Sequence, residues 1–192
     1  MMGRFAWNLR AAFYDQVFRL PLFRRIREEE DASFKELTKG FAVQDARILD
    51  VACGTGHYMK ILGGGRLYGL DYSAEMLRIA GDKQKASLVL GDARHLPFKT
   101  ASMDRVVCIG LLEYFGDREA VLREISRVLR KDGLGVLSYS RKNIFNTLRN
   151  LLGSRVHACS VEEFAISLNK CLLEWVNGRE SLLQGQVLCR KA

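Results

Sequence analysis

Long apolar runs are missing from this sequence of 192 residues. Every hydrophobic stretch is far shorter than the roughly 20 residues that a membrane-spanning helix requires. The first residues, Met-Met-Gly-Arg-Phe-Ala-Trp, lack the apolar core of a secretory signal, and their glycine stands at position 3, which argues against myristoylation. These absences favour a cytoplasmic protein, and 48% of hydrophobic residues suffices for one domain with a full-sized core.

Paired cysteines are missing as well. No Cys-x-x-Cys arrangement occurs among the five scattered cysteines, which are Cys53, Cys108, Cys159, Cys171 and Cys189. Such a set favours buried thiols that fill small core spaces over a catalytic thiol or a soft-metal site. The three histidines have no metal-ligand spacing, so we expect no bound metal.

Acidic residues are scarce at both ends of the chain. Residues 1–27 contain six arginines against one aspartate, and residues 141–192 contain eight lysines and arginines against four glutamates. The middle, residues 28–140, contains sixteen basic and seventeen acidic residues, so the net charge of +8 comes from the ends. Basic ends can attract an anionic substrate, an anionic membrane surface or nucleic acid, or they can serve only solubility.

A glycine-rich turn follows the first strand pattern. Residues 48–56 read Ile-Leu-Asp-Val-Ala-Cys-Gly-Thr-Gly, in which Gly54 and Gly56 can adopt positive φ and leave no Cβ between backbone and ligand. The second strand pattern ends at Asp71, 17 residues after Gly54, where a carboxylate can accept both hydroxyls of a ribose. Together these features indicate a nucleoside site.

A dinucleotide is disfavoured at this site. Its fingerprint places a third glycine three residues after the second, where this chain has Met59. A pyrophosphate at the helix N-terminus, and with it a nicotinamide-dependent oxidoreductase, is therefore disfavoured.

Strand and helix patterns alternate along the chain. Near-continuous apolar runs predict strands over 47–52, 67–71, 87–91, 105–109 and 134–139. Helical patterns cover 58–62, 74–82, 118–130, 143–152 and 161–172, and two further strands lie near 173–176 and 186–189. The alternation predicts a doubly wound, parallel α/β sheet whose ligand lies at the carboxyl ends of the strands, near Gly54, Asp71 and Asp92.

Local signals refine two of these helices. Ser73 is a plausible N-cap for the helix over 74–82. One apolar stripe marks the helix over 118–130 and consists of Val121, Leu122, Ile125, Val128 and Leu129.

Residues 1–40 have no strand pattern. Phe5, Leu9, Phe13, Val17 and Leu20 recur at helical spacing, and Pro21 breaks or restarts the helix. We expect an N-terminal helical cap over residues 1–40 that packs on the sheet, closes the site and belongs to the same domain as residues 41–192. Contact with a lipid surface and a dimer contact are the alternatives.

Several motifs resemble those of the class I S-adenosylmethionine-dependent methyltransferases. The run from Asp50 to Gly56 resembles their first motif, residues 70–77 their second, and residues 91–98 with 102–107 their third and fourth. Residues 129–134 resemble the turn before their fifth strand. The chain departs from the family at Ala52, where glycine is frequent, and at Asp132, where proline is common. The resemblance implies a mostly parallel seven-stranded sheet whose last strand is antiparallel.

The resemblance also implies S-adenosylmethionine as the cofactor. Ala52 and Cys53, with Gly54 and Gly56, would pass under its methionyl part, and Asp50 would orient that turn and the donor amine. Asp71 would hold the ribose hydroxyls.

The remaining implied contacts come from later strands and from the N-terminus. Tyr72 would flank the adenine, Asp92 would accept from its amino group, and the Ala93 amide would donate to a ring nitrogen. Ile109, Gly110 and Leu111 would line the donor near its sulfur. Tyr14, in Phe-Tyr-Asp, resembles an N-terminal aromatic–acidic pair that folds over the donor.

Catalytic candidates follow the fourth predicted strand. Glu113 and Tyr114 stand where an acceptor would approach, and Glu113 could serve as a general base or be only a carboxylate at a helix start. Methyl transfer from a sulfonium needs little covalent help, because positioning alone can contribute roughly 7–11 kcal/mol.

The acceptor class is narrowed by the scarcity of proline. With Pro21 and Pro97 alone, the chain has no Asn-Pro-Pro-Tyr, Asp-Pro-Pro-Tyr or Pro-Cys motif, which argues against methylation of base amines or of cytosine C5. We expect transfer to a small-molecule or lipid-like acceptor, with S-adenosylhomocysteine as the product, because residues between the fourth and fifth strands resemble quinone-biosynthesis methyltransferases. The acceptor pocket should lie between the N-terminal helices and residues 109–115 and 139–157.

Two alternatives remain open for the function. One is an RNA-directed methyltransferase that uses the basic ends. The other is a non-catalytic S-adenosylmethionine-binding partner protein. The oligomeric state is not indicated by the sequence.

Overall fold

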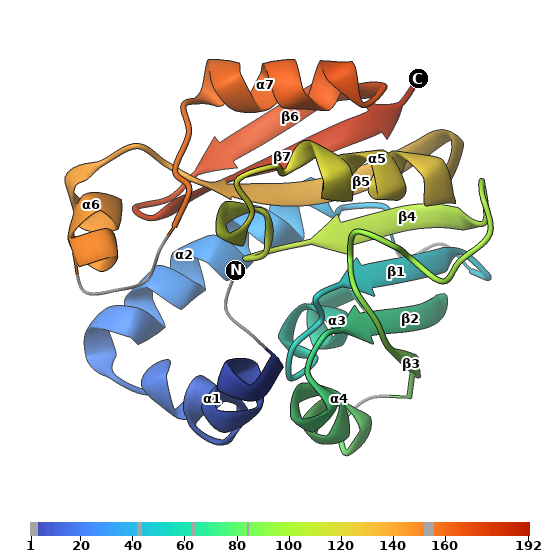
Figure 1. Cartoon of the computed structure of the whole chain (residues 1–192). Coiled ribbons are helices and arrows are strands. Elements are labelled where there is room, and N and C mark those ends of the chain that lie inside the picture. The colour runs from blue at the N-terminus through green and yellow to red at the C-terminus, as the bar shows by residue number, and fades with distance from the viewer. Residues whose placement is uncertain (1–3, 42–43, 63, 84, 152–155) are drawn as a thin grey trace.

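A computed structural model describes residues 4–41, 44–62, 64–83, 85–151 and 156–192 (Figure 1). Within them, a seven-stranded sheet has the order β3-β2-β1-β4-β5-β7-β6. The first five strands in this order are parallel, whereas β7 runs antiparallel to both of its neighbours, β5 and β6. The predicted α/β sheet, mostly parallel with an antiparallel last strand, is confirmed.

The strands are β1 (Arg47–Val51), β2 (Arg66–Asp71), β3 (Ser87–Leu90), β4 (Met103–Cys108), β5 (Leu129–Ser140), β6 (Leu173–Glu180) and β7 (Gln184–Lys191). The helices are α1 (Arg4–Val17), α2 (Pro21–Leu37), α3 (His57–Leu62), α4 (Ala74–Gly81), α5 (Glu119–Val128), α6 (Ile144–Leu151) and α7 (Val161–Lys170), with a 3-10 turn η1 (Leu112–Tyr114). The last position of the helix expected over 143–152 lies outside the described residues.

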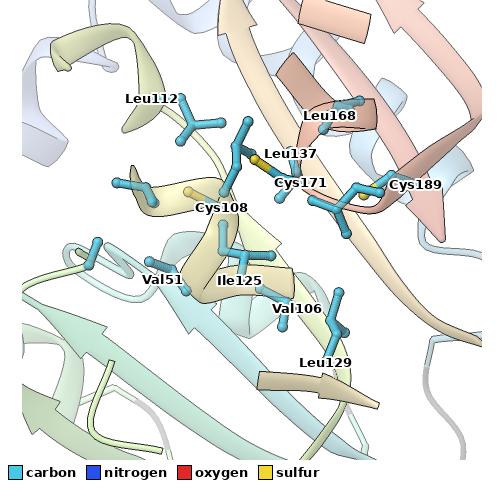
Figure 2. Packing of buried hydrophobic residues seen from close by; sticks show 14 of the residues in the cluster. Val51, Val106, Cys108, Leu112, Ile125, Leu129, Leu137, Leu168, Cys171 and Cys189 are labelled. Atoms are coloured by element: carbon cyan, nitrogen blue, oxygen red, sulfur yellow. The ribbon is translucent and has the colours of Figure 1, made fainter. Parts of the chain in front are cut away.

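Helices cover both faces of the sheet, which explains why its strands are apolar on both sides. Leu49 and Val51 of β1 belong to a core that includes Ile125 of α5, whereas Ile48, the residue before Leu49, points to the opposite face and packs with Phe34 of α2 in a second core. Figure 2 shows the first core, in which Ile125 lies among side chains from β1, β4 and β5. The two cores cover the middle of the sheet, so polar side chains are found at the carboxyl ends of the parallel strands.

The local signals for α4 and α5 are confirmed. The hydroxyl of Ser73 accepts a hydrogen bond from the Met76 N–H and so caps α4. The whole predicted stripe of α5 is buried to 1% exposure or less.

The boundary between α5 and β5 was predicted wrongly. The helix ends at Val128 rather than at residue 130, because Leu129 is already extended and pairs with Met103 of β4. The strand therefore begins five residues earlier than expected and contains an irregular segment in which Asp132 has a φ of 59°. Proline, common here in the family that the sequence resembles, could not adopt that conformation because its ring holds φ near −65°.

The last two strands are longer than predicted. Residues 177–180 extend β6 although they are polar or glycine, because an edge strand can face solvent and needs no apolar run. All five cysteines are buried and free, as predicted for thiols that fill core spaces.

The apolar series of α1 faces outward, contrary to the spacing argument. Phe5, Leu9, Phe13 and Val17 are exposed, whereas Ala11, buried at 3%, lies on the opposite side. The helix does pack against α4, but through a different face. Across the described residues, no helix combines the length and hydrophobicity needed to cross a bilayer.

Candidate functional site

The turn after β1 is held by a carboxylate from the neighbouring strand. Asp71, at the end of β2, accepts 2.9 Å and 2.8 Å hydrogen bonds from the backbone N–H groups of Gly54 and Ser73. The turn has positive φ at Ala52, Gly54 and Gly56, as expected for the two glycines. Ala52 adopts φ 60° despite its Cβ, a conformation that costs about 1–2 kcal/mol.

A first cavity opens at the carboxyl ends of the parallel strands. It brings together most of the residues expected around a nucleoside: Tyr14, Ala52, Gly54, Asp71, Tyr72, Asp92, Ala93, Ile109, Gly110 and Leu111. Gly54 and Gly110 both have positive φ, and a Cβ added at either would meet open space. The backbone therefore borders the first cavity directly at these two positions.

Three residues expected at the ligand do not line the first cavity. The buried Asp50 lies at the end of β1, Cys53 contributes backbone contacts to the turn, and Gly56 lines a separate hollow beside α3. Asp50 is unusual because its Oδ2 is buried and has no hydrogen-bond partner among the described residues. Burial, and then the charge of Asp71, raises the pKa of Asp50 well above its usual range.

Other residues of the first cavity were not predicted as ligand contacts, although three of them stand within the quoted motifs over 70–77 and 91–98. The residues concerned are Trp7, Leu70, Met76, Gly91 and Phe115, with Tyr114 expected only as a catalytic candidate. Trp7 stands two helical turns before Tyr14, so the spacing of these two aromatic residues was the available signal for the inner face of α1. The aliphatic positions carry no signal that separates them from ordinary core residues.

Polar contacts hold α1 over the first cavity. The Ser73 hydroxyl donates to Asn8 at 2.6 Å, and Asp15 accepts from the Thr55 hydroxyl at 2.8 Å and forms an ion pair with Lys83 at 2.7 Å. These contacts join α1 to the glycine turn and to both ends of α4.

An aromatic contact completes the attachment of α1. The rings of Trp7 and Tyr114 meet edge to face, with centroids 5.4 Å apart. Because Tyr114 lies in η1, α1 reaches from the glycine turn to the segment after β4.

Asp92 lies at the edge of the first cavity and is paired with a neighbouring arginine. Its Oδ2 lies 2.6 Å from a guanidinium nitrogen of Arg94, and its Oδ1 accepts from the Arg94 backbone N–H at 2.9 Å. The side-chain hydrogen bond from Arg94 lowers the pKa of Asp92, so this carboxylate is ionised at neutral pH.

A second cavity, of about 210 Å³, lies between the N-terminal helices and the segments after β4 and β5. Its ionisable lining consists of Arg27 and Glu30 from α2, Glu113 from η1 and Arg149 from α6, and the phenol groups of Tyr14, Tyr58 and Tyr114 also border it. The location agrees with the predicted acceptor pocket. Arg27, Glu30 and Arg149 were not predicted, since nothing in the sequence distinguishes them from surface charges.

Both carboxyl groups of the second cavity hold protons more tightly than usual. Burial raises the pKa of Glu30 to about 7, with Arg27 opposing and Glu113 adding to the effect. Burial also raises the pKa of Glu113, whose Oε2 has no hydrogen-bond partner among the described residues. The pKa of Tyr114 is raised to about 12 by burial, so its phenol stays protonated at neutral pH.

The two cavities share four lining residues: Tyr14, Ile109, Gly110 and Tyr114. At their centre, Gly110 has φ 72° and its N–H donates to the Ser138 hydroxyl at 2.8 Å. Because Gly110 has no side chain, a ligand atom in the first cavity can approach a ligand atom in the second cavity at this position. In the described part of the chain, His, Cys, Asp and Glu side chains form no group of three that could hold a metal ion.

The sequence matches the family model described as "Methyltransferase domain" over residues 49–137. It is 34% identical over 146 residues to the uncharacterized protein MJ1252 of Methanocaldococcus jannaschii, covering 74% of this chain and 53% of the relative. It is also 34% identical over 132 residues to the demethylmenaquinone methyltransferase of Thermotoga maritima, covering 59% and 58%. The chain thus spans little more than half the length of these curated relatives.

A likeness in fold extends over nearly the whole chain. The crystal structure of magnesium protoporphyrin IX methyltransferase from Synechocystis PCC 6803, with bound S-adenosylhomocysteine, superposes with a TM-score of 0.76 over 98% of each chain. At 15% sequence identity, this likeness concerns the fold alone.

Proposed function

The chain belongs to the class I S-adenosylmethionine-dependent methyltransferases, and from that premise we propose that it methylates a small-molecule acceptor, with S-adenosylhomocysteine as the second product. The observation that carries the proposal is the junction of the two cavities at Gly110. One cavity has the residues expected for the methyl donor, and the other has the ionisable groups that an acceptor can use.

The first cavity is the donor site. Asp71 is fixed by the backbone N–H groups of Gly54 and Ser73 and borders the first cavity, where its carboxylate would hold the ribose hydroxyls. The ionised Asp92 would accept from the adenine amino group, and the Ala93 N–H would donate to a ring nitrogen. The positive φ and open space at Gly54 and Gly110 fit a ligand that lies against the backbone.

Asp50 does not line the first cavity, but it stands two residues before the glycine turn that does. Its partnerless Oδ2 is costly in the free protein, since buried polar atoms are nearly always hydrogen-bonded. An ammonium group of the donor near this carboxylate would offset that cost, which supports the role expected for Asp50.

The second cavity is the acceptor site. S-adenosylmethionine, when bound, supplies a methyl carbon made electrophilic by its positively charged sulfur. The protein's contribution is to hold the acceptor in line across Gly110 and to exclude water. Arg27 and Arg149 bind and orient anionic or carbonyl groups of the acceptor.

A proton leaves the acceptor if its nucleophile is a hydroxyl or an acidic carbon. Glu113, next to the junction, and Glu30, deeper along α2, are the bases available to take it. The pKa of Glu30, raised to about 7, suits this role because such a base is both partly ionised and strong enough at neutral pH, and the pKa of Glu113 is raised in the same direction by burial. Tyr114 donates a hydrogen bond to the acceptor.

Mass spectrometry of small molecules that copurify with the full chain, followed by transfer of a tritiated methyl group into cell-extract fractions, tests the proposal. We expect S-adenosylmethionine or S-adenosylhomocysteine in the protein and label in a small-molecule or lipid fraction. Label in RNA, with binding that weakens steeply as salt rises, would contradict the small-molecule acceptor. Donor binding without label in any fraction would indicate a non-catalytic binding protein.

A further inference from the structure

We propose that the outer face of α1 and the start of α2 rest on the surface of an anionic lipid bilayer. We call this face the N-terminal apolar surface. It consists of Phe5, Leu9, Phe13, Val17, Leu20, Leu22 and Phe23, all of them exposed.

The helix α1 is apolar on two opposite faces, and only one of them is covered. The inner face directs Trp7 and Tyr14 to the first cavity and buries Ala11. The outer face leaves Phe5 76% exposed and Phe13 65% exposed. The outer face therefore presents large apolar side chains that no other segment of the described chain covers. An apolar patch of this kind marks an interaction site.

The charges beside this face have one sign. Arg19 and Arg25 are exposed and have no carboxylate within 4 Å among the described residues, and Arg24 has a weak pair with Glu28 at 3.7 Å. The sole acidic residue before Glu28 in the sequence is Asp15. It is already engaged by Thr55 and Lys83 on the inner side of α1, so it does not neutralise the outer arginines.

This combination selects an anionic lipid surface as the occupant. Phenylalanine and leucine side chains can enter the boundary between headgroups and acyl chains, while neighbouring arginines pair with phosphate groups. Each arginine near such a surface strengthens binding about fivefold, so the charges and the apolar side chains act together.

The N-terminal apolar surface adjoins the second cavity. Phe23 belongs to both, and Arg149 of α6 lines the same cavity. Besides supplying Arg149 to this cavity, α6 has the exposed apolar side chains of Ile144, Leu148 and Leu151. A lipid-dissolved acceptor would thus have a short path to the second cavity, a consequence that rests on the proposed function.

Sedimentation of the full chain with lipid vesicles, in the absence of any methyl donor, tests the proposal. We expect at least about tenfold stronger binding to phosphatidylcholine mixed with phosphatidylglycerol than to phosphatidylcholine alone, and weaker binding at high salt. The double variants Leu9→Ser/Phe13→Ser and Arg19→Glu/Arg25→Glu should each lower binding to the mixture about tenfold or more.

Matched controls come from the far side of the molecule. Ile166→Ser removes an exposed apolar side chain from α7, and Lys131→Glu reverses an exposed charge on β5, so neither should change vesicle binding. Circular dichroism and the thermal midpoint show whether each variant is folded.

Three results would overturn the proposal. The first is the absence of binding to the anionic mixture by the folded wild-type chain, and the second is an equal loss of binding in the test and control variants. The third is a dimer in light scattering that Leu9→Ser/Phe13→Ser dissociates, because the surface would then be covered by a second copy. None of these results would affect donor binding or methyl transfer, which are measured without lipid.

Discussion

The carboxylate of Asp71 at the end of β2 accepts a 2.9 Å hydrogen bond from the backbone N–H of Gly54 in the turn after β1. This bond connects two strand ends that are 17 residues apart in the sequence and fixes the wall of the first cavity. Asp71 therefore acts on the turn as well as on the ligand that we place there.

Asp71→Asn should weaken donor binding by an order of magnitude or more. The amide keeps one acceptor oxygen for the backbone but loses the charge and the second acceptor needed for two ribose hydroxyls. Calorimetric titration with S-adenosylhomocysteine measures the change, and Asp45→Asn, at an exposed turn, is the matched control. Equal affinities for wild type and Asp71→Asn would remove Asp71 from the proposed donor site.

Trp7→Ala should weaken S-adenosylhomocysteine binding about tenfold, because the ring lines the first cavity and packs against Tyr114. Phe5→Ala, in the same helix but on its outer face, should leave this affinity unchanged in the absence of lipid. Calorimetric titration of both variants with S-adenosylhomocysteine measures the two affinities. If the two variants behaved alike, α1 would have no specific role at the donor site.

Glu113→Gln should lower kcat by about 100-fold or more while leaving donor affinity unchanged, if the acceptor must lose a proton. The substitution preserves the shape of the side chain and removes its basicity. Single-turnover methyl transfer to the acceptor, once labelled fractions have identified it, gives kcat and KM separately. Loss of donor affinity instead of kcat would mean that Glu113 supports the first cavity rather than the reaction.

Glu30→Gln should stabilise the protein above pH 7. The native pKa of Glu30 is raised from 4.5 to about 7, so the folded state binds the proton more tightly than the unfolded state does. Wild-type stability therefore falls as pH rises from 4.5 to 7, by an amount on the order of 3 kcal/mol, and the full cost remains above pH 7.

Urea unfolding of both proteins at pH 4 and pH 8 measures this difference. The variant should gain at pH 8 and show little change at pH 4. A constant difference between the two proteins at both pH values would contradict a raised pKa at Glu30.

Ala52→Gly should raise the free energy of unfolding by up to about 1 kcal/mol. The left-handed conformation of Ala52 is strained, and glycine relieves that strain at some cost in unfolded-state entropy. Ala101→Gly is a matched control for the strain, because Ala101 has φ 52° in an exposed turn outside both cavities. Similar gains in both variants would show backbone strain alone, whereas a loss of stability at Ala52 would contradict this interpretation.

The local patterns of the sequence were sufficient for the sheet and for most of the first cavity. Continuous apolar runs predicted a sheet that is covered by helices on both faces. Glycine and aspartate at the ends of the first three strands predicted that Gly54, Asp71 and Asp92 lie at one edge of the sheet. These inferences succeeded because parallel strands necessarily end at the same edge. For parallel strands, a residue's place at the end of its strand in the sequence therefore fixes its place at the edge of the sheet.

The second cavity and the orientation of α1 were decided by tertiary structure. Glu30 and Arg149 are far apart in the sequence and look like surface charges there, yet packing of α2 and α6 brings them to one cavity. In α1, apolar residues occur on both sides, so helical periodicity could not identify the buried face. Trp7 and Tyr14 pack inward because the first cavity and Tyr114 offer them a complementary surface, while Phe5 and Phe13 remain exposed.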